Sequence, residues 1–213
     1  MKRLGAIVSL LSLLMLVAAC NNPASEVNKA VTAEAQKATS PQTTAGAQQY
    51  AITPQNSKIE FVGSKVTGRH NGSFEKFNGQ IHYTNSDPTQ SHVTITIDTS
   101  SVKADDPKLT EHLKTPDFFD IGKFPDAKFE STAIKTGGEK GGTHTVTGNL
   151  TLHGVTKSIT FPATISVTGD AATVDADFAI NRKDFGINYP GAQDNLIRDE
   201  VVMRLRLRAN KAS

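Results

Sequence analysis

Two residue types are almost missing from this chain of 213 residues: it has no tryptophan, and its single cysteine is Cys20. One cysteine cannot form a disulfide within the chain, so a folded domain has to be held together by its apolar core. Acidic and basic residues nearly balance, at 21 and 23. Removal of Lys2 and Arg3 with a signal peptide would bring the formal charge to zero. A neutral protein has no electrostatic basis for binding nucleic acid, and we expect none.

Motifs for catalysis and for metal binding are also lacking. No two histidines have the short spacing that places two metal ligands on one face of an element. The histidines are His70, His82, His92, His112, His144 and His153. The chain contains no Gly-x-Ser-x-Gly elbow and offers no cysteine nucleophile within the domain. We therefore expect neither an enzyme nor a resident metal or other cofactor.

Residues 1–19 have the features of a lipoprotein signal peptide. Lys2 and Arg3 precede an apolar run from Leu4 to Val17, which is shorter than the about 20 residues that a transmembrane helix needs. Small residues end the run, and Cys20 follows at once, which resembles the bacterial lipobox. This predicts lipid attachment to the Cys20 thiol; an ordinary signal peptide followed by a chance cysteine is the alternative. Because the next residue is asparagine and not aspartate, we expect a lipid-anchored protein of the cell envelope, in the outer membrane and facing the periplasm.

Residues 20–49 are predicted to form an acylated, flexible tether. Apart from Cys20, the segment is built mainly from Ala, Thr, Gln, Ser and Asn, and it contains no aromatic residue. Such a composition buries too little apolar surface to fold alone. A frayed helix over Glu26–Ala38 is the alternative for part of it.

From Tyr50 onward, apolar and polar residues alternate with a period of two. In one example Ile159, Phe161, Ala163 and Ile165 alternate with Ser158, Thr160, Thr164 and Ser166. About eight segments follow this pattern, which is typical of half-buried antiparallel strands. Residues 50–213 are therefore predicted to form one all-β domain. Closure into a barrel would remove the exposed edges, and a β-sandwich is the alternative.

One segment interrupts the strand pattern with a short helix. Asp106 is placed to cap the helix, Pro107 to begin it and Pro116 to follow its end. A helix inserted among strands can cover one end of a closed sheet.

Several motifs together resemble a known family. The most specific are Gly148–Lys157 and Asn181–Gly186, and Asp117–Asp120 lies in the helical insert between strands. In order and spacing they are similar to the YceI-like, polyisoprenoid-binding domain, over Tyr50–Ala209. The resemblance implies a lipocalin-like antiparallel barrel with an elongated apolar cavity for a long-chain lipid. Many relatives carry Arg-Asp before the His-Leu of the insert, where this chain has Thr110 and Glu111.

Inward-facing apolar side chains are the candidates for lining such a cavity, with ordinary core packing as the alternative for each. The candidates are Phe61, Phe74, Phe77, Ile95, Ile97, Phe118, Phe119, Phe129, Phe161, Phe178, Phe185, Met203 and Leu205. The predicted function is that of a membrane-tethered protein that sequesters or carries a polyisoprenoid or isoprenoid-quinone type of lipid. A barrel filled by its own side chains, serving as a structural or adaptor lipoprotein, is the alternative. The presence of a ligand-sized cavity distinguishes the two.

Two groups of charged residues each have two interpretations. Arg182–Asp184 follow a strand and either close one end of the barrel with hydrogen bonds or contact a lipid headgroup. Arg204, Arg206 and Arg208 form a stripe that is either the solvated face of the last strand or a contact for anionic lipids.

Overall fold

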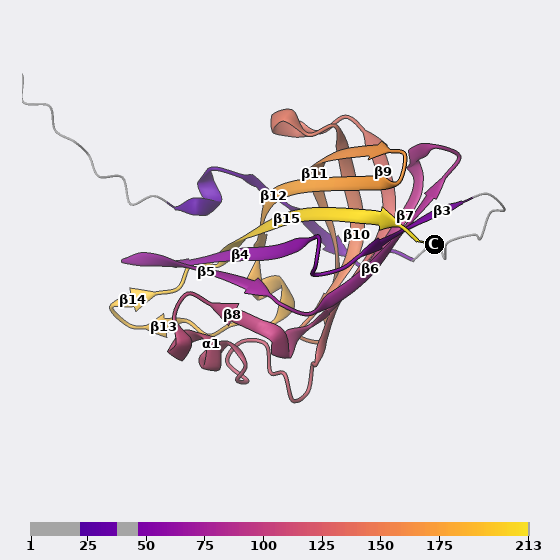
Figure 1. Cartoon of the computed structure of the whole chain (residues 1–213). Helices are drawn as coiled ribbons and strands as arrows, with labels where there is room; N and C mark the ends of the chain where they lie inside the picture. Colours follow the sequence, from indigo (N-terminus) through magenta and orange to yellow (C-terminus); the bar gives the residue numbers. More distant parts are fainter. Residues whose placement is uncertain (1–21, 38–46, 213) are drawn as a thin grey trace, which may run out of the picture.

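The alternating segments form long antiparallel strands that close into a barrel (Figure 1). The computed structural model describes residues 22–37 and 47–212. The barrel strands are β3 (Gln48–Ile52), β6 (Phe77–Thr84), β7 (Asp87–Asp98), β9 (Asp126–Thr136), β10 (His144–Leu152), β11 (Val155–Thr168), β12 (Ala171–Asn181) and β15 (Glu200–Lys211). Closure occurs where β15 pairs with β12 on one side and with β3 on the other. The predicted all-β class and eight-stranded antiparallel barrel are confirmed, so the sandwich alternative is wrong.

Shorter elements extend one end of the barrel. The strands β4 (Lys58–Lys65) and β5 (Gly68–Phe74) form a hairpin beside β15, and β8 (Val102–Ala104) pairs with β5. The other short elements are η2 (Thr99–Ser101), η3 (Glu139–Gly141), η4 (Arg182–Phe185), β13 (Gly191–Ala192) and β14 (Asn195–Leu196). Among the described residues, no helix is long and apolar enough to cross a membrane.

The predicted helical insert is confirmed as α1 (Pro107–Leu113). The Asp106 carboxylate accepts hydrogen bonds from the backbone N–H groups of Lys108 and Leu109, so it caps the first turn as expected. In Figure 1, α1 lies at the end of the barrel where β8 and the β13–β14 hairpin also lie. The helix therefore covers part of that end.

Aromatic side chains fill the interior toward the opposite end of the barrel. Phe161 stacks on Phe178 with ring centroids 4.0 Å apart, and Phe129 lies 5.9 Å from Phe161. Tyr50 is fully buried, and its hydroxyl donates to the Gly169 carbonyl at 2.9 Å. We call this region, centred on Phe129, Phe161 and Phe178, the filled half.

Residues before the barrel form part of its wall. The segment contains η1 (Pro23–Ser25), β1 (Asn28–Lys29) and β2 (Val31–Glu34). Strand β1 runs parallel to β12, and β2 runs antiparallel to β11. Because β11 and β12 pair directly only at 164–168 with 171–175, the two short strands fill the opening between them farther along.

This arrangement differs from the flexible tether, and from the frayed helix, that the composition of residues 20–49 predicts. Outside the barrel, Ala24 and Val27 pack against Val62, Ala179 and Val202. These apolar residues face outward, and they provide a partner that the composition of the segment itself cannot reveal. Cys20, the predicted signal peptide over residues 1–19, and residues 38–46 lie outside the described residues.

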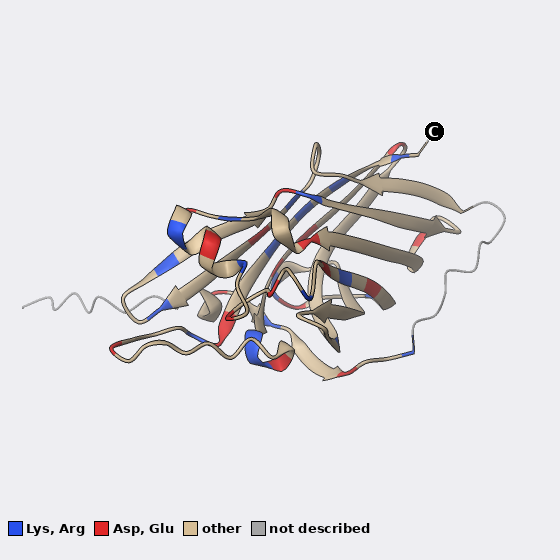
Figure 2. Cartoon of the chain, turned by 90° about the horizontal axis from the view of Figure 1, so that it is seen from below, with Lys and Arg blue, Asp and Glu red and all other residues tan. Residues whose placement is uncertain are grey.

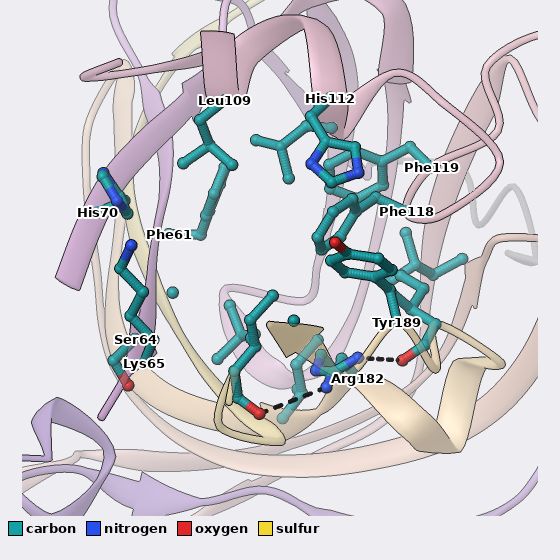
Figure 3. Close-up of a pocket in the computed structure, with 18 of the residues that line it drawn as sticks. Phe61, Ser64, Lys65, His70, Leu109, His112, Phe118, Phe119, Arg182 and Tyr189 are labelled. Atoms are coloured by element: carbon teal, nitrogen blue, oxygen red, sulfur yellow. Dashed lines mark hydrogen bonds between the residues drawn. The ribbon is translucent and has the colours of Figure 1, made fainter. Parts of the chain in front are cut away.

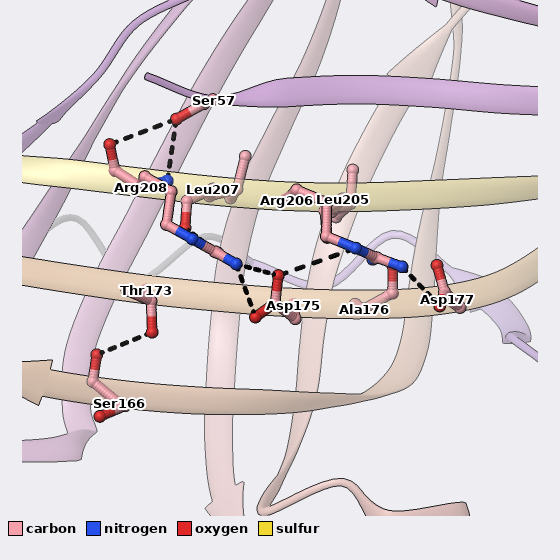
Figure 4. Close-up of polar contacts among 10 residues, drawn as sticks. All are labelled: Ser57, Ser166, Thr173, Asp175, Ala176, Asp177, Leu205, Arg206, Leu207 and Arg208. Atoms are coloured by element: carbon pink, nitrogen blue, oxygen red, sulfur yellow. Dashed lines mark hydrogen bonds and ion pairs between the residues drawn. The ribbon is translucent and has the colours of Figure 1, made fainter.

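Two arginines of the stripe on β15, Arg206 and Arg208, are paired with aspartates of β12 (Figure 4). Arg206 lies 2.8 Å from Asp177, and Arg208 lies 2.8 Å from Asp175. The hydrogen bond that the Arg206 guanidinium donates to Asp177 raises the pKa of Arg206 above its usual value. Since the charges of Arg206 and Arg208 are balanced within the wall, the structure favours the solvated-face interpretation for these two residues.

Candidate functional site

The end of the barrel beside α1 encloses a cavity of about 340 Å³ (Figure 3). Its walls come from β4 and β5, from α1, from the segment 182–197, and from the barrel strands β7, β9, β10, β12 and β15. Gly63 of β4 lines it, and a Cβ atom at this position would meet no atom within 4 Å. The volume lies within the roughly 300–1,000 Å³ typical of ligand pockets. We call this region the open half.

Six of the candidates from the sequence line the cavity. They are Phe61, Phe74, Ile97, Phe118, Phe119 and Met203. Ring contacts connect some of them: Phe74 lies 5.7 Å from Phe61 and 5.5 Å from Phe119. The structure thus brings strand residues and residues after α1 around one space.

The other seven candidates do not line the cavity. They are Phe77, Ile95, Phe129, Phe161, Phe178, Phe185 and Leu205. Their inward direction was expected, but they belong to the packed core, where facing side chains touch across the barrel. Phe185, for example, is completely buried beside the η4 turn.

Several lining residues were not among the candidates. The apolar ones are Leu109, Leu113, Ala127, Leu150, Leu152, Ile180, Ile187, Ile197 and Val201. Leu150 and Leu152 lie in a strand whose alternation was visible in the sequence. Ile187 and Ile197 lie on an irregular segment without a periodic signal, so sequence pattern alone could not place them in the cavity.

Aromatic rings join α1 to the irregular segment at the cavity mouth. The His112 ring lies 5.0 Å from both Phe118 and Tyr189, and Phe118 lies 5.4 Å from Tyr189. The His112 Nε2 atom is 2.7 Å from Asp117 Oδ2. Figure 3 shows these rings on one side of the cavity, across from Lys65 and His70.

Polar side chains are a minority of the lining, and His70 and Lys65 are two of them. His70 Nδ1 is 2.8 Å from Asp105 Oδ1, and Asp105 also accepts a hydrogen bond from the Asn71 backbone. That backbone hydrogen bond is the main reason that the pKa of Asp105 lies below its usual value. The ammonium group of Lys65 has no hydrogen bond or ion pair with any described residue. It is therefore available to a polar group entering the mouth.

Arg182 holds the irregular segment in place. Its side chain is 5% exposed, and its guanidinium donates to the carbonyls of Ile187 at 2.6 Å and Arg198 at 3.2 Å. Burial lowers the pKa of Arg182, and Asp199, 3.4 Å away, opposes the shift. Because its donors are engaged by the protein, Arg182 closes the loop and is not a free headgroup contact.

His92 is a buried titratable residue outside the cavity lining. Nε2 of His92 is 3.4 Å from Glu130 Oε1 but makes no hydrogen bond. Burial lowers the pKa of His92, whereas Glu130 raises it. Within the described residues, no group of three or more His, Cys, Asp or Glu side chains is arranged to hold a metal ion.

Comparisons with known proteins agree with this architecture. The family described as the YceI-like domain matches residues 50–209. A UPF0312 protein of Pseudomonas putida strain W619 is 40% identical over 127 residues, which are 57% of this chain and 65% of that relative. The match thus spans slightly less than two thirds of the relative's length.

Solved structures show the same fold. BcnA of Burkholderia cenocepacia is 28% identical, with a TM-score of 0.66 over 75% of this chain and 99% of BcnA. A polyisoprenoid binding domain from Saccharophagus degradans is 17% identical, with a TM-score of 0.61 over 76% of this chain and 98% of that domain. At this identity the second similarity concerns the fold alone.

Proposed function

This chain belongs to the YceI-like domain family, and from that membership and the apolar cavity we propose that its barrel binds the apolar chain of a long-chain lipid. The observation that carries the proposal is the cavity of about 340 Å³, walled mainly by aliphatic and aromatic side chains. A barrel filled by its own side chains would lack such a space. The cavity therefore favours a binding protein over a purely structural or adaptor lipoprotein.

The polar groups indicate how the lipid lies. Its apolar chain would contact Phe61, Ile97 and Met203, which line the cavity. Its polar end would remain near Lys65 and His70 at the mouth, where a charged or hydrogen-bonding group finds partners. A polyisoprenoid or isoprenoid quinone has this division into a long apolar chain and one polar end.

The energetics suit a carrier. Each methylene group moved out of water gains roughly 0.8 kcal/mol, so a free long-chain lipid essentially never leaves a membrane. The cavity offers surroundings similar to those of a bilayer, so transfer between the two is nearly neutral. A barrel of this kind can therefore both load and release its lipid.

The direct test is mass spectrometry of lipid extracted from the purified full-length protein. We expect one class of long-chain apolar lipid to co-purify and to be displaced by a fluorescent long-chain probe. Absence of co-purified lipid together with failure to bind the probe would contradict the proposal.

We also propose that the protein is anchored by lipid on Cys20 and resides in the outer membrane, facing the periplasm. The support is the apolar run that ends at Cys20, with Asn21 directly after it. Growth with a labelled fatty acid should label the wild type but not Cys20→Ser, and fractionation should place the label in the outer membrane. An unlabelled wild type would refute the anchor, and labelled protein in the inner membrane would refute the location.

A further inference from the structure

Two exposed apolar side chains lie together at the cavity mouth. Among the described residues, the exposed large apolar side chains are Val31, Val66 and Leu196, at 67%, 53% and 50%. The Val66 N–H donates to the Leu196 carbonyl at 3.3 Å, which joins the tip of the β4–β5 hairpin to the β13–β14 hairpin. Adjacent apolar side chains left in water commonly mark an interaction surface.

This pair borders the cavity. Lys65 and Ile197, the chain neighbours of Val66 and Leu196, both line the cavity and form a backbone bridge with each other. We propose that these two hairpin tips dock on a lipid bilayer, so that the barrel meets the membrane with its mouth. The inference rests on the proposed lipid binding, because a docked mouth would exchange lipid with that bilayer.

Charge on the tips fits a bilayer surface better than it fits an apolar protein partner. The β4–β5 tip carries Lys65 and Arg69 and has no acidic residue between them. The β13–β14 tip carries one acidic residue, Asp194. In Figure 2, where Lys and Arg are blue and Asp and Glu are red, both colours appear on the hairpins at the left of the molecule. Cations beside exposed apolar side chains are typical of surfaces that bind anionic lipid headgroups.

The N-terminal segment brings the proposed anchor to the same end of the molecule. Ala24 packs on Val62, which precedes Val66 by four residues on the same hairpin, a separation of roughly 13 Å along a strand. Cys20 precedes Asn22 by two residues, so at most about 7 Å of chain separates their Cα atoms. Figure 1 shows η1 and both hairpin tips at the left and the C-terminus at the right. A lipid on Cys20 would therefore enter the bilayer close to the tips.

The absence of tryptophan from the chain provides a direct test. Val66→Trp and Val31→Trp each introduce one tryptophan at an exposed site, the second on β2 and outside the cavity lining. The full-length protein, purified from membranes, would be reconstituted in vesicles of anionic phospholipid with brominated acyl chains. We expect Val66→Trp to lose most of its fluorescence and Val31→Trp to keep it. Quenching of neither, or equal quenching of both, would overturn the proposal.

A kinetic test connects docking to lipid exchange. Combined Val66→Asp and Leu196→Asp should slow uptake of a fluorescent long-chain lipid from vesicles by about tenfold, because two apolar contacts with the bilayer are lost. The amount bound at saturation should not change, and Val31→Asp should leave both quantities unchanged. An unchanged uptake rate in the double variant would overturn docking. A wild type that binds no lipid would instead refute the proposed function, while the tryptophan measurement would still decide docking.

Discussion

The filled and open halves of the barrel show the same alternation of side chains along their strands, yet one is packed and the other hollow. Toward one end, Phe129, Phe161 and Phe178 reach across the interior and touch. Toward the other, Phe61 and Phe119 stand around a cavity of about 340 Å³. Alternation determines which way a side chain points. Whether it meets a partner depends on the opposite wall, and in the open half that wall includes a helix and an irregular loop.

Two glycines on neighbouring strands show the difference between filled and empty space on the scale of single atoms. A Cβ atom at Gly72 of β5 would lie 2.2 Å from the ring of Phe61, which occupies the space above it. A Cβ atom at Gly63 of β4 would meet nothing within 4 Å. One glycine makes room for a ring of the protein, and the other leaves room that the protein does not use.

The largest loss of stability is expected in the filled half. Phe161→Ala should lower the free energy of unfolding by about 3–5 kcal/mol, because it removes a ring that stacks on Phe178 and contacts Phe129, and it leaves a void. Urea denaturation measures this loss. Phe119→Ala, in the open half, is the matched variant: it should cost less stability and should lower lipid occupancy more. Equal stability losses for the two variants would remove the distinction between the halves.

A smaller loss of stability is expected when Arg182 no longer holds the irregular segment that forms part of the wall of the open half. Arg182→Met keeps an apolar side chain but leaves the Ile187 and Arg198 carbonyls without their donor. We expect a loss of about 2–3 kcal/mol, since hydrogen bonds from a charged group are involved, together with weaker retention of lipid. Arg182→Lys should not rescue the variant, because one ammonium cannot reproduce the guanidinium geometry. Full recovery of stability and lipid retention in Arg182→Lys would mean that the positive charge, and not the guanidinium geometry, holds the segment.

A variant that fills the cavity should lose lipid binding while it keeps most of its stability. Gly63→Leu places a side chain in the empty space, so we expect less than about 1 kcal/mol of destabilisation and loss of most bound lipid. Gly72→Ala adds fewer atoms but displaces Phe61, and it should destabilise the barrel more. Melting temperature and lipid content, measured on the same samples, check both expectations. Undiminished lipid content in Gly63→Leu would show that the lipid does not occupy the cavity.

A change of pH should have the smallest effect on stability, and it should not alter the difference between the filled and open halves. The pKa of His92 is lowered from 6.5 in the folded protein, so folding favours the neutral ring. Stability is therefore complete above about pH 6.5 and decreases as the pH falls through that value toward the lowered pKa. Asp105, whose pKa is lowered from 3.8, contributes a separate loss only below that range. Urea denaturation at about pH 7.5 and about pH 5 should show the first loss in the wild type and not in His92→Gln.

The sequence predicted the barrel well because its signals are local. Alternation along single strands, the Asp106 cap and the order of motifs each involve residues close together in the chain. The cavity was predicted only in part, because it depends on contacts between distant segments. The sequence indicated that Phe119 and Phe161 both lie inside the domain, but not that only Phe161 has a ring stacked against it.

The structure of the N-terminal segment also depends on contacts with distant residues, so local sequence could not predict it. Its composition indicated a tether because nothing within it can form a core. Three runs of adjacent apolar residues were visible, at 61–62, 178–180 and 201–203. In such a run one side chain has to face outward, and Val62, Ala179 and Val202 do so beneath Ala24. A break in alternation is thus a signal for a covering segment, although it does not identify that segment.

The position of β1 and β2 also sets an order of events during folding. This segment is synthesised before every strand of the barrel, but its partners are among the last strands made. Lys29 pairs with Glu200 across 171 residues, and Glu34 pairs with Lys157 across 123 residues. Contacts between such distant residues form slowly, because a long loop has to close first. The segment that contains β1 and β2 is therefore among the last to find its place, and its arrival seals the wall between β11 and β12.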